Sequence, residues 1–352
     1  MSIAPVLRTR PTESRAAQPL PAVTIAGRRL QPTVVFDTYW HFAVARQRLY
    51  FDRITGRSTS VDDDILSRHR FTNCYRATDR VSQFGIRSVA YGGPQEPQDV
   101  VFRTLLFKFF NKIETWELLE STIGPISWRT WREDVARAVL DAAFKAGRRL
   151  YSAAYVIPPP PMGAVRKHAN HLQLLSYMMN EGLPNKLTDA ASMRQAYEML
   201  LHYPGIGRFI GYQLLIDLNY SSVLNFNEGE YIVAGPGARD GIRKCFGPAS
   251  HGIEEQVIEW VTETQQLHFN RLGLDFETLG GRPLQLIDCQ NLFCEVDKYA
   301  RVAHPEVTGL SGRQRIKQNY RQDPRALTPW FPPKWGIEKS FAQQVSRYSK
   351  ES

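Results

Sequence analysis

The sequence contains few cysteines and no long apolar segment, and both absences narrow the class of protein. Its four cysteines, Cys74, Cys245, Cys289 and Cys294, include no CxxC pair. We therefore expect no metal, neither a structural zinc site nor an iron–sulfur cluster, and reduced thiols in a cytoplasmic protein. No run of eighteen apolar residues occurs, so no membrane span is predicted, and we expect no secretory signal.

The positive charge of the chain lies at its two ends. The net charge is +9, of which residues 1–30 carry +4 and residues 301–352 carry +6, so the middle is close to neutral. Basic ends favour a polyanion such as DNA through counterion release, although they can equally serve as solubilising tails. We expect a disordered basic segment over 1–32, a helical domain over 33–302 that could form two lobes around a cleft, and a basic, Pro- and Arg-rich, mostly irregular tail over 303–352.

Helical periodicity dominates the middle of the chain, and the predicted fold class is mainly α. The strongest run covers residues 97–122, where apolar residues are nearly continuous until Asn111 and Lys112 interrupt them. Polar residues after such a buried run line a cleft or mark a bend in the helix. Strand signals are few, and we expect short strands only at 223–226 and 231–234.

The segment from Leu200 to Glu230 predicts two helices joined by the tight turn Pro204-Gly205-Ile206-Gly207. Glycines free the backbone at such a turn and expose N–H groups at the start of the next helix, where a phosphate can bind. An ordinary helix–helix corner is the alternative interpretation. The turn resembles the helix-hairpin-helix of the DNA glycosylase superfamily, and the resemblance implies a helix-hairpin-helix glycosylase-like helical fold.

The same resemblance implies catalytic and DNA-binding residues. In that superfamily an acid follows the first turn glycine by a little over twenty residues, which selects Glu228, with Glu230 and Asp240 in reserve. Phe209 stands where strand-cutting members carry a lysine, so a monofunctional enzyme is expected. We predict no cofactor, apart from a monovalent cation that the hairpin could bind as in some relatives.

Further glycines and cations could hold DNA phosphates. A second tight turn, Gly235-Pro236-Gly237-Ala238, opens another predicted helix, and a simple loop is an equally good interpretation of it. In the segment from Arg70 to Arg80, an arginine and amide face could bind a phosphate or form an internal network. The predicted phosphate-binding residues are Gly205, Gly207, Arg208, Gly235, Gly237, Arg243, Lys244, Arg70, Arg76 and Arg80.

Four motifs in order also resemble the helical domain of 5-hydroxymethyluracil DNA kinases, a group also described as alpha-glutamyl/putrescinyl thymine pyrophosphorylases. They are RFTNCYRATDRVSQF, TLLFKFFNKIETWELL, EGEYIVAGPGARDGIRKCF and LIDCQNLFCEVDKY, within residues 36–302. No GxxxxGK[ST] motif occurs, so kinase activity is not carried over. Polar residues in the last motif could equally form a buried network that holds the fold. The predicted base pocket consists of Phe109, Phe110, Asn111, Lys112, Asn73, Asp288, Gln290 and Asn291.

These resemblances lead to one principal functional prediction and two alternatives. The principal prediction is a DNA glycosylase-like hydrolase that flips and excises a modified, 5-hydroxymethyl-type pyrimidine, in a role that could be anti-phage defence. The first alternative is a non-excising enzyme or accessory domain in the hypermodification of 5-hydroxymethyluracil in phage-type DNA. The second is a module that only binds modified DNA. All three share one expected partner, double-stranded DNA carrying modified pyrimidines, and none predicts an oligomeric state.

Overall fold

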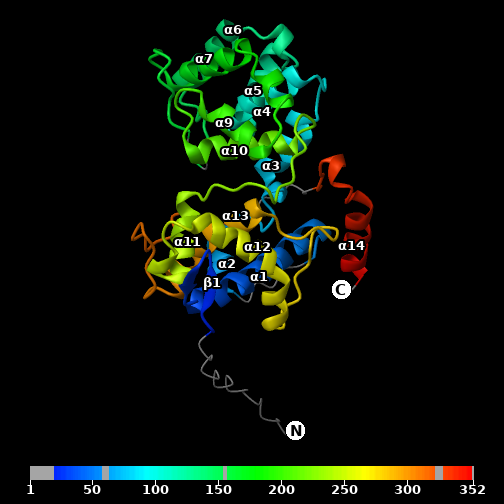
Figure 1. Ribbon diagram of the computed structural model, residues 1–352. Helices are drawn as coiled ribbons and strands as arrows, with labels where there is room; N and C mark the ends of the chain where they lie inside the picture. The colour runs from blue at the N-terminus through cyan, green and yellow to red at the C-terminus, as the bar shows by residue number, and fades with distance from the viewer. Residues whose placement is uncertain (1–19, 58–62, 154–156, 322–327, 351–352) are drawn as a thin grey trace, which may run out of the picture.

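The computed structural model describes residues 20–57, 63–153, 157–321 and 328–350, and within them the chain is mainly helical. Figure 1 shows two groups of helices, which we call the upper and lower lobes. The upper lobe contains α3 (Arg80–Phe84), the π-helical turn η2 (Gly85–Ala90), α4 (Pro97–Phe110), α5 (Ile113–Ile123), η3 (Trp128–Thr130), α6 (Glu133–Lys145), α7 (Lys167–Asn180), α8 (Leu183–Thr188), α9 (Met193–Leu201) and α10 (Arg208–Tyr220).

The lower lobe is built from both ends of the chain. Its elements are β1 (Val23–Ile25), β2 (Arg28–Leu30), α1 (Val34–Thr55), α2 (Asp64–Arg68), α11 (Pro236–Phe246), η4 (Pro248–Ser250), α12 (Glu254–Arg271), α13 (Leu286–Ala303) and α14 (Glu338–Lys350). Helix α13 lies at the centre of this lobe and packs against α1, α11 and α12. The short η1 (Arg76–Thr78) lies where the chain passes from the lower to the upper lobe, and η5 (Pro333–Trp335) precedes α14.

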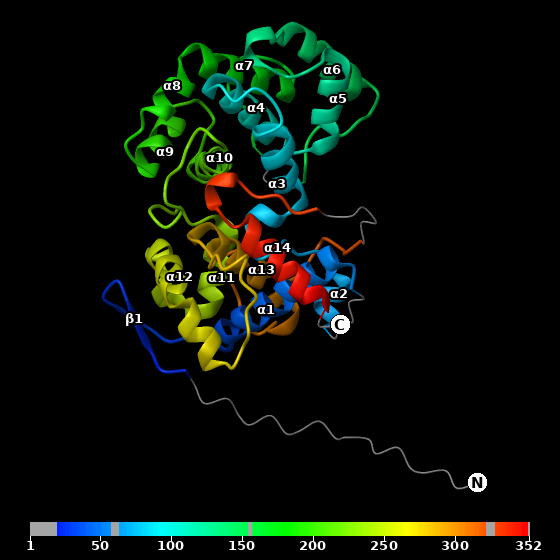
Figure 2. The same ribbon diagram turned by 90° about the vertical axis from the view of Figure 1, so that its right-hand side faces the viewer.

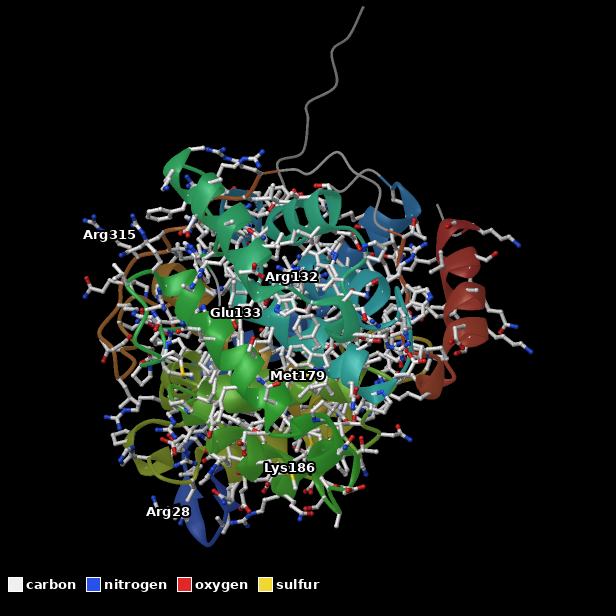
Figure 3. The ribbon with its side chains drawn as sticks, turned by 90° about the horizontal axis from the view of Figure 1, so that it is seen from above. Arg28, Arg132, Glu133, Met179, Lys186 and Arg315 are labelled. Carbon is white, nitrogen blue, oxygen red and sulfur yellow. The ribbon has the colours of Figure 1, made fainter. Side chains whose placement is uncertain are left out.

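The structure differs from expectation at both ends of the chain. Residues 1–19 lie outside the described part, but residues 23–30 form an antiparallel hairpin in which Val23 pairs with Leu30. Arg28 of this hairpin donates to the carbonyl of His251 at 2.6 Å, which fixes it to the lower lobe. Residues 338–350 form a helix, because Phe341 and Gln344 give it a face that packs against α1. Seen from above, Arg28 and Arg315 lie at the outer rim of the molecule (Figure 3).

The two segments that were expected to be strands do not form strands in the structure. Residues 223–226 and 231–234 carry no strand pairing among the described residues. Side chains satisfy part of their backbone instead: the Asn219 side chain bonds to both the N–H and the carbonyl of Phe226. Glu255 likewise accepts from the N–H of Ala234 at 3.1 Å. A β-rich sequence therefore forms an extended connection between α10 and α11.

Helix α4 ends where the sequence predicts an interruption. Asn111 adopts a left-handed conformation with φ 48° and caps the helix, and α5 begins two residues later. Asparagine tolerates this conformation better than other residues that carry a Cβ. The predicted run over 97–122 is thus two helices that meet at a bend. No helix in the described part of the chain combines the length and apolar character needed to cross a membrane.

Candidate functional site

Both lobes border a cleft made of two adjoining cavities. The inner cavity has a volume of about 170 Å³ and the outer one about 320 Å³. They share the lining residues Arg70, Phe71, Thr72, Arg80, Val81, Asn111 and Ser152. The inner cavity is further bounded by α4 and α10 of the upper lobe, and the outer one by Lys298 and Gln318 of the lower lobe. Together we call them the cleft.

A carboxylate held between two cations lies in the wall of the inner cavity. Asp217, on α10, pairs with Lys108 Nζ at 2.8 Å and with Arg76 Nη1 at 2.6 Å. The Asp217 side chain is 20% exposed, whereas those of Arg76 and Lys108 are almost fully buried. Burial alone would raise the pKa of Asp217, but the charges of Arg76 and Lys108 outweigh it and lower the pKa. Asp217 is therefore a fixed, ionised hydrogen-bond acceptor.

Burial acts in the opposite direction on the lysine. It lowers the pKa of Lys108 to about 8, although the neighbouring Asp217 carboxylate opposes the shift. The backbone of Arg76 is bound to the lower lobe, because its N–H donates to Asp288 Oδ1 of α13 at 2.8 Å. Its guanidinium thus reaches α10 of the upper lobe while its backbone is bound to the lower lobe. The cluster of Arg76, Lys108 and Asp217 therefore joins the two lobes at the cleft.

Helix α4 presents one face to the inner cavity. The lining residues Thr104, Phe107, Lys108 and Asn111 follow the i, i+3, i+4, i+7 spacing of a single helical face. Asn111 is 6% exposed, and its side-chain amide makes no hydrogen bond to another described residue. Because Asn111 lines the cavity, a ligand there can form hydrogen bonds with an amide that no described residue occupies.

The mouth of the cleft is cationic. The outer cavity is lined by Arg70, Arg80, Lys112, Arg149 and Lys298. It continues into a third cavity of about 210 Å³ that adds Arg148. Lys112 pairs with Glu114 at 2.6 Å and Lys298 with Glu295 at 2.5 Å, and the cations outnumber the acids in the lining of the outer cavity. The excess of positive charge suits a phosphate backbone.

The cleft therefore combines features that suit a nucleotide. Cavities of about 150 Å³ in engineered proteins admit benzene, so the inner cavity is large enough for one six-membered ring. Its wall offers the acceptor Asp217, the donor Lys108 and the mixed donor and acceptor Asn111, which together can address the polar edge of a base. Phe107 supplies an apolar surface in the same wall.

The predicted catalytic acids do not line this cleft. Glu228 is buried and accepts a hydrogen bond from Arg282 Nη2 at 2.7 Å, and it is absent from the linings of all three cavities. Burial raises the pKa of Glu228, partly offset by the Arg282 charge. Glu230 is exposed. Asp240 is buried and accepts from the backbone N–H of Ser311 at 2.7 Å, a structural contact with the chain beyond α13.

The predicted base-pocket residues separate into three groups. Asn111 and Lys112 line the cleft. Phe109 and Phe110 point elsewhere and stack on His171 and Tyr151, with ring centroids 5.4 and 5.0 Å apart. The remaining four form a buried network that holds the segment before α3 and the turn before α11 onto neighbouring elements: Asn73, Asp288, Gln290 and Asn291.

The predicted phosphate-binding residues also lie in several places. Arg70, Arg76 and Arg80 line or border the cleft, whereas Lys244 is buried in an ion pair with Asp297 at 3.0 Å. The Gly235 N–H donates to Gln290, and a Cβ on Gly237 would approach Cys294 Sγ at 3.0 Å. Phosphate binding stays a prediction for Arg243 and for the hairpin residues Gly205, Gly207 and Arg208. Gly205 adopts the left-handed conformation, with φ 78°.

Phe107, Lys108 and Asp217 are among the cleft residues that sequence reasoning missed. A signal for Lys108 was present, because a lysine inside a nearly continuous apolar run must find a buried partner. Asp217 interrupts the apolar face of the second hairpin helix in the same way. Each residue predicts that a partner exists, but only the packing of α4 against α10 makes them partners of each other.

Comparisons with known proteins place the chain in one family. The family described as 5-hmdU DNA kinase, helical domain, matches residues 33–309. The 5-hmdU DNA kinase of Bacillus phage SP10 is 24% identical over 288 residues, which cover 75% of this chain and 45% of that protein. This chain thus spans less than half the length of that relative. No solved structure matches the chain.

These comparisons correct the principal functional prediction. A base-excising glycosylase, and hence a hydrolase, is wrong, because the relative is named as a kinase, which is a transferase, and the matched family is that of its helical domain. The alternative, a role in modifying hydroxymethylated DNA, fits better. The error arose from the spacing between Gly205 and Glu228, which does not determine where the carboxylate points. In the structure that carboxylate is bound by Arg282 and lies outside the cleft.

Proposed function

This chain belongs to the family of the 5-hmdU DNA kinase helical domain, and we propose that it recognises a 5-hydroxymethylpyrimidine nucleotide in DNA without breaking the glycosidic bond. The nucleotide turns out of the duplex and its base enters the inner cavity. The flanking phosphates lie along the cationic outer cavity. In this role the chain selects and presents the base for a modification reaction at its 5-hydroxymethyl group.

The observation that carries the proposal is the polar wall of the inner cavity. The Asn111 side chain has no hydrogen-bond partner among the described residues, Lys108 is a buried donor, and Asp217 is an acceptor with one fifth of its side chain exposed. A pyrimidine edge alternates donors and acceptors, and a hydroxymethyl group both donates and accepts. The site therefore offers this ligand more hydrogen bonds than it offers an unmodified base.

The proposal assigns recognition, and not phosphate transfer, to the described residues. No GxxxxGK[ST] loop occurs in the sequence. The related phage protein is named for kinase activity on 5-hmdU in DNA, and it is more than twice as long as the region it shares with this chain. Its name supports the substrate class, a hydroxymethylated deoxyuridine within DNA, as the ligand of the cleft.

Binding to modified and unmodified duplexes tests the proposal. Three duplexes of identical sequence carry 5-hydroxymethyldeoxyuridine, thymidine or 5-hydroxymethyldeoxycytidine at one position, with 2-aminopurine next to it to report unstacking. We expect the tightest binding and the largest rise in fluorescence with the hydroxymethyldeoxyuridine duplex. Nucleoside mass spectrometry after incubation should show every base still attached. Equal affinity for all three duplexes would refute base recognition.

A further inference from the structure

The C-terminal segment inserts a lysine into the end of helix α10. Lys334 Nζ donates to the backbone carbonyls of Asn219, Ser221 and Leu224 at 2.5, 2.7 and 2.5 Å. Carbonyls at the C-terminal end of a helix lack intrahelical partners and carry partial negative charge, so a cation is favoured there. Three carbonyls arranged around one ammonium use all three of its N–H donors.

The residues around Lys334 extend this contact across the lobes. Trp335 packs edge-on against Tyr220, the last residue of α10, with ring centroids 5.6 Å apart. The Trp335 ring also contacts Arg282, whose guanidinium lies 4.2 Å from the ring centroid and binds Glu228. Figure 2 shows this part of the chain, drawn in red, lying beneath α10 before it continues into α14 along the lower lobe.

The anchor on the lower lobe is equally specific. Gln344 of α14 accepts from the N–H of Gly280 and donates to Glu277 and Thr278, and Phe341 packs on Phe51 of α1. Trp330, before the lysine, exchanges two hydrogen bonds with Gln83 of α3. The described residues 328–350 therefore bind both lobes, and they lie beyond the region 33–309 that the family match covers.

Helix α10 connects this contact to the cleft. Asp217 lies one turn before the end of α10, and Arg76, its partner, also lies over the Tyr220 ring at 5.6 Å. A displacement at the end of α10 would therefore change the positions of Asp217 and Arg76 in the cavity wall.

We propose that Lys334 is a positioning residue, which holds the C-terminal end of α10 on the strap formed by residues 328–350 and so sets the place of Asp217 in the cleft. The effect of this positioning on DNA rests on the proposed function, whereas the contact itself does not. Burial lowers the pKa of Lys334 to about 8, although the charge of the nearby Glu228 opposes the shift.

Hydrogen exchange tests the contact without DNA. In Lys334→Met, which removes the charge and keeps the length, we expect amides of residues 212–226 to exchange about threefold to tenfold faster, because the helix end loses its cation. Lys334→Arg keeps a cation and should remain closer to the native protein. Lys339→Met, which changes an exposed lysine of α14 five positions further along the same strap, serves as the matched control. Unchanged exchange over 212–226 in Lys334→Met would overturn the proposal.

Chemical rescue separates a specific ammonium contact from a general loss of packing. In Lys334→Ala, n-propylammonium replaces the deleted part of the side chain and should restore slow exchange over 212–226. Tetramethylammonium at the same ionic strength has no N–H and should not. Rescue by both salts, or by neither, contradicts the ammonium contact.

DNA-binding measurements on the same variant test whether Lys334 positions Asp217. Lys334→Met should lose preference for the hydroxymethylated duplex, with a smaller change in affinity for the thymidine duplex. If exchange rises while the preference is unchanged, Lys334 stabilises α10 without positioning the cleft, and the proposal fails. If the native protein itself shows no preference, the function proposed above fails, while the exchange and rescue arms still decide the contact.

Discussion

Removing the side chain of Asn111 is the most direct test of the cleft, and the left-handed backbone there supplies its own control. Asn111 has φ 48° and caps α4. Glycine adopts this conformation without strain, so Asn111→Gly deletes the amide and leaves the backbone undisturbed. Asn111→Ala deletes the same amide but places a Cβ in the left-handed region, which costs about 1–2 kcal/mol of folding free energy.

The expected effect on binding follows from the hydrogen bonds that the amide can form. In the structure the Asn111 side chain is buried and has no partner among the described residues, so its loss leaves no protein group unsatisfied. A bidentate contact between an amide and a base contributes about 1–3 kcal/mol, equivalent to a 5- to 150-fold change in Kd. We expect both variants to lose this factor on the hydroxymethyldeoxyuridine duplex, and Asn111→Ala alone to lose stability.

Fluorescence anisotropy at one fixed salt concentration measures the affinities, and urea unfolding measures the stabilities. The two variants should have the same Kd within error and differ in unfolding free energy by about 1–2 kcal/mol. If Asn111→Gly binds the modified duplex as tightly as the native protein, the cleft does not read the base through this residue. If the variants differ in Kd as they differ in stability, the binding effect is backbone strain and the reasoning is refuted.

Three further changes test the charges around the cleft. Lys108→Met removes one of the two cations paired with Asp217 and leaves Arg76 in place, so it should cost less than the about 3–5 kcal/mol of a fully broken buried pair, which urea unfolding measures. Adding Asp217→Asn to that variant should cost more stability, because it removes the carboxylate from the buried Arg76 guanidinium, and an unchanged stability would argue against the coupling. Arg149→Gln removes an exposed cation from the outer cavity, so it should weaken modified and unmodified duplexes alike and lower the salt dependence of log K by about 1. Arg132→Gln, at the start of α6 and paired with Asp134, should change neither affinity nor slope. Burial raises the pKa of Asp288 to about 7 from 3.8, so the folded state binds more protons than the unfolded chain between these values and stability falls as pH rises from 4 to 7. Asp288→Asn should flatten this fall by up to about 4 kcal/mol, and an unchanged pH profile of unfolding would contradict the shift.

Local chemistry made part of this structure predictable. The two hairpin helices, α9 and α10, were expected on either side of Pro204–Gly207, and the structure ends one at Leu201 and begins the other at Arg208. The interruption at Asn111 was expected as well, since a polar residue after a buried run has to end the packing. In both cases neighbours in the sequence determine the outcome, so the pattern alone suffices.

Partnerships between distant residues could not be predicted in the same way. The tail was expected to be irregular because proline, glycine and arginine dominate it, yet Lys334 finds three carbonyls more than a hundred positions earlier in the chain. Phe109 and Phe110 were expected to face a base because they precede Asn111. A shift of one or two positions on a helix turns a side chain by 100° or 200°, and the cavity face falls on Phe107 and Lys108 instead.

The charge of the cleft supports the proposal that it binds a base without excising it. Departure of a base from its sugar builds positive charge, which an uncompensated carboxylate stabilises. Asp217, the carboxylate paired with cations in the cavity wall, already shares its charge with Lys108 and Arg76, and Glu228 is bound by Arg282. Arg70, Arg80 and Arg149 add more positive charge around it. Such surroundings oppose a developing cation and favour anions, namely the phosphates that flank an extruded nucleotide and a phosphate attached to its hydroxymethyl group.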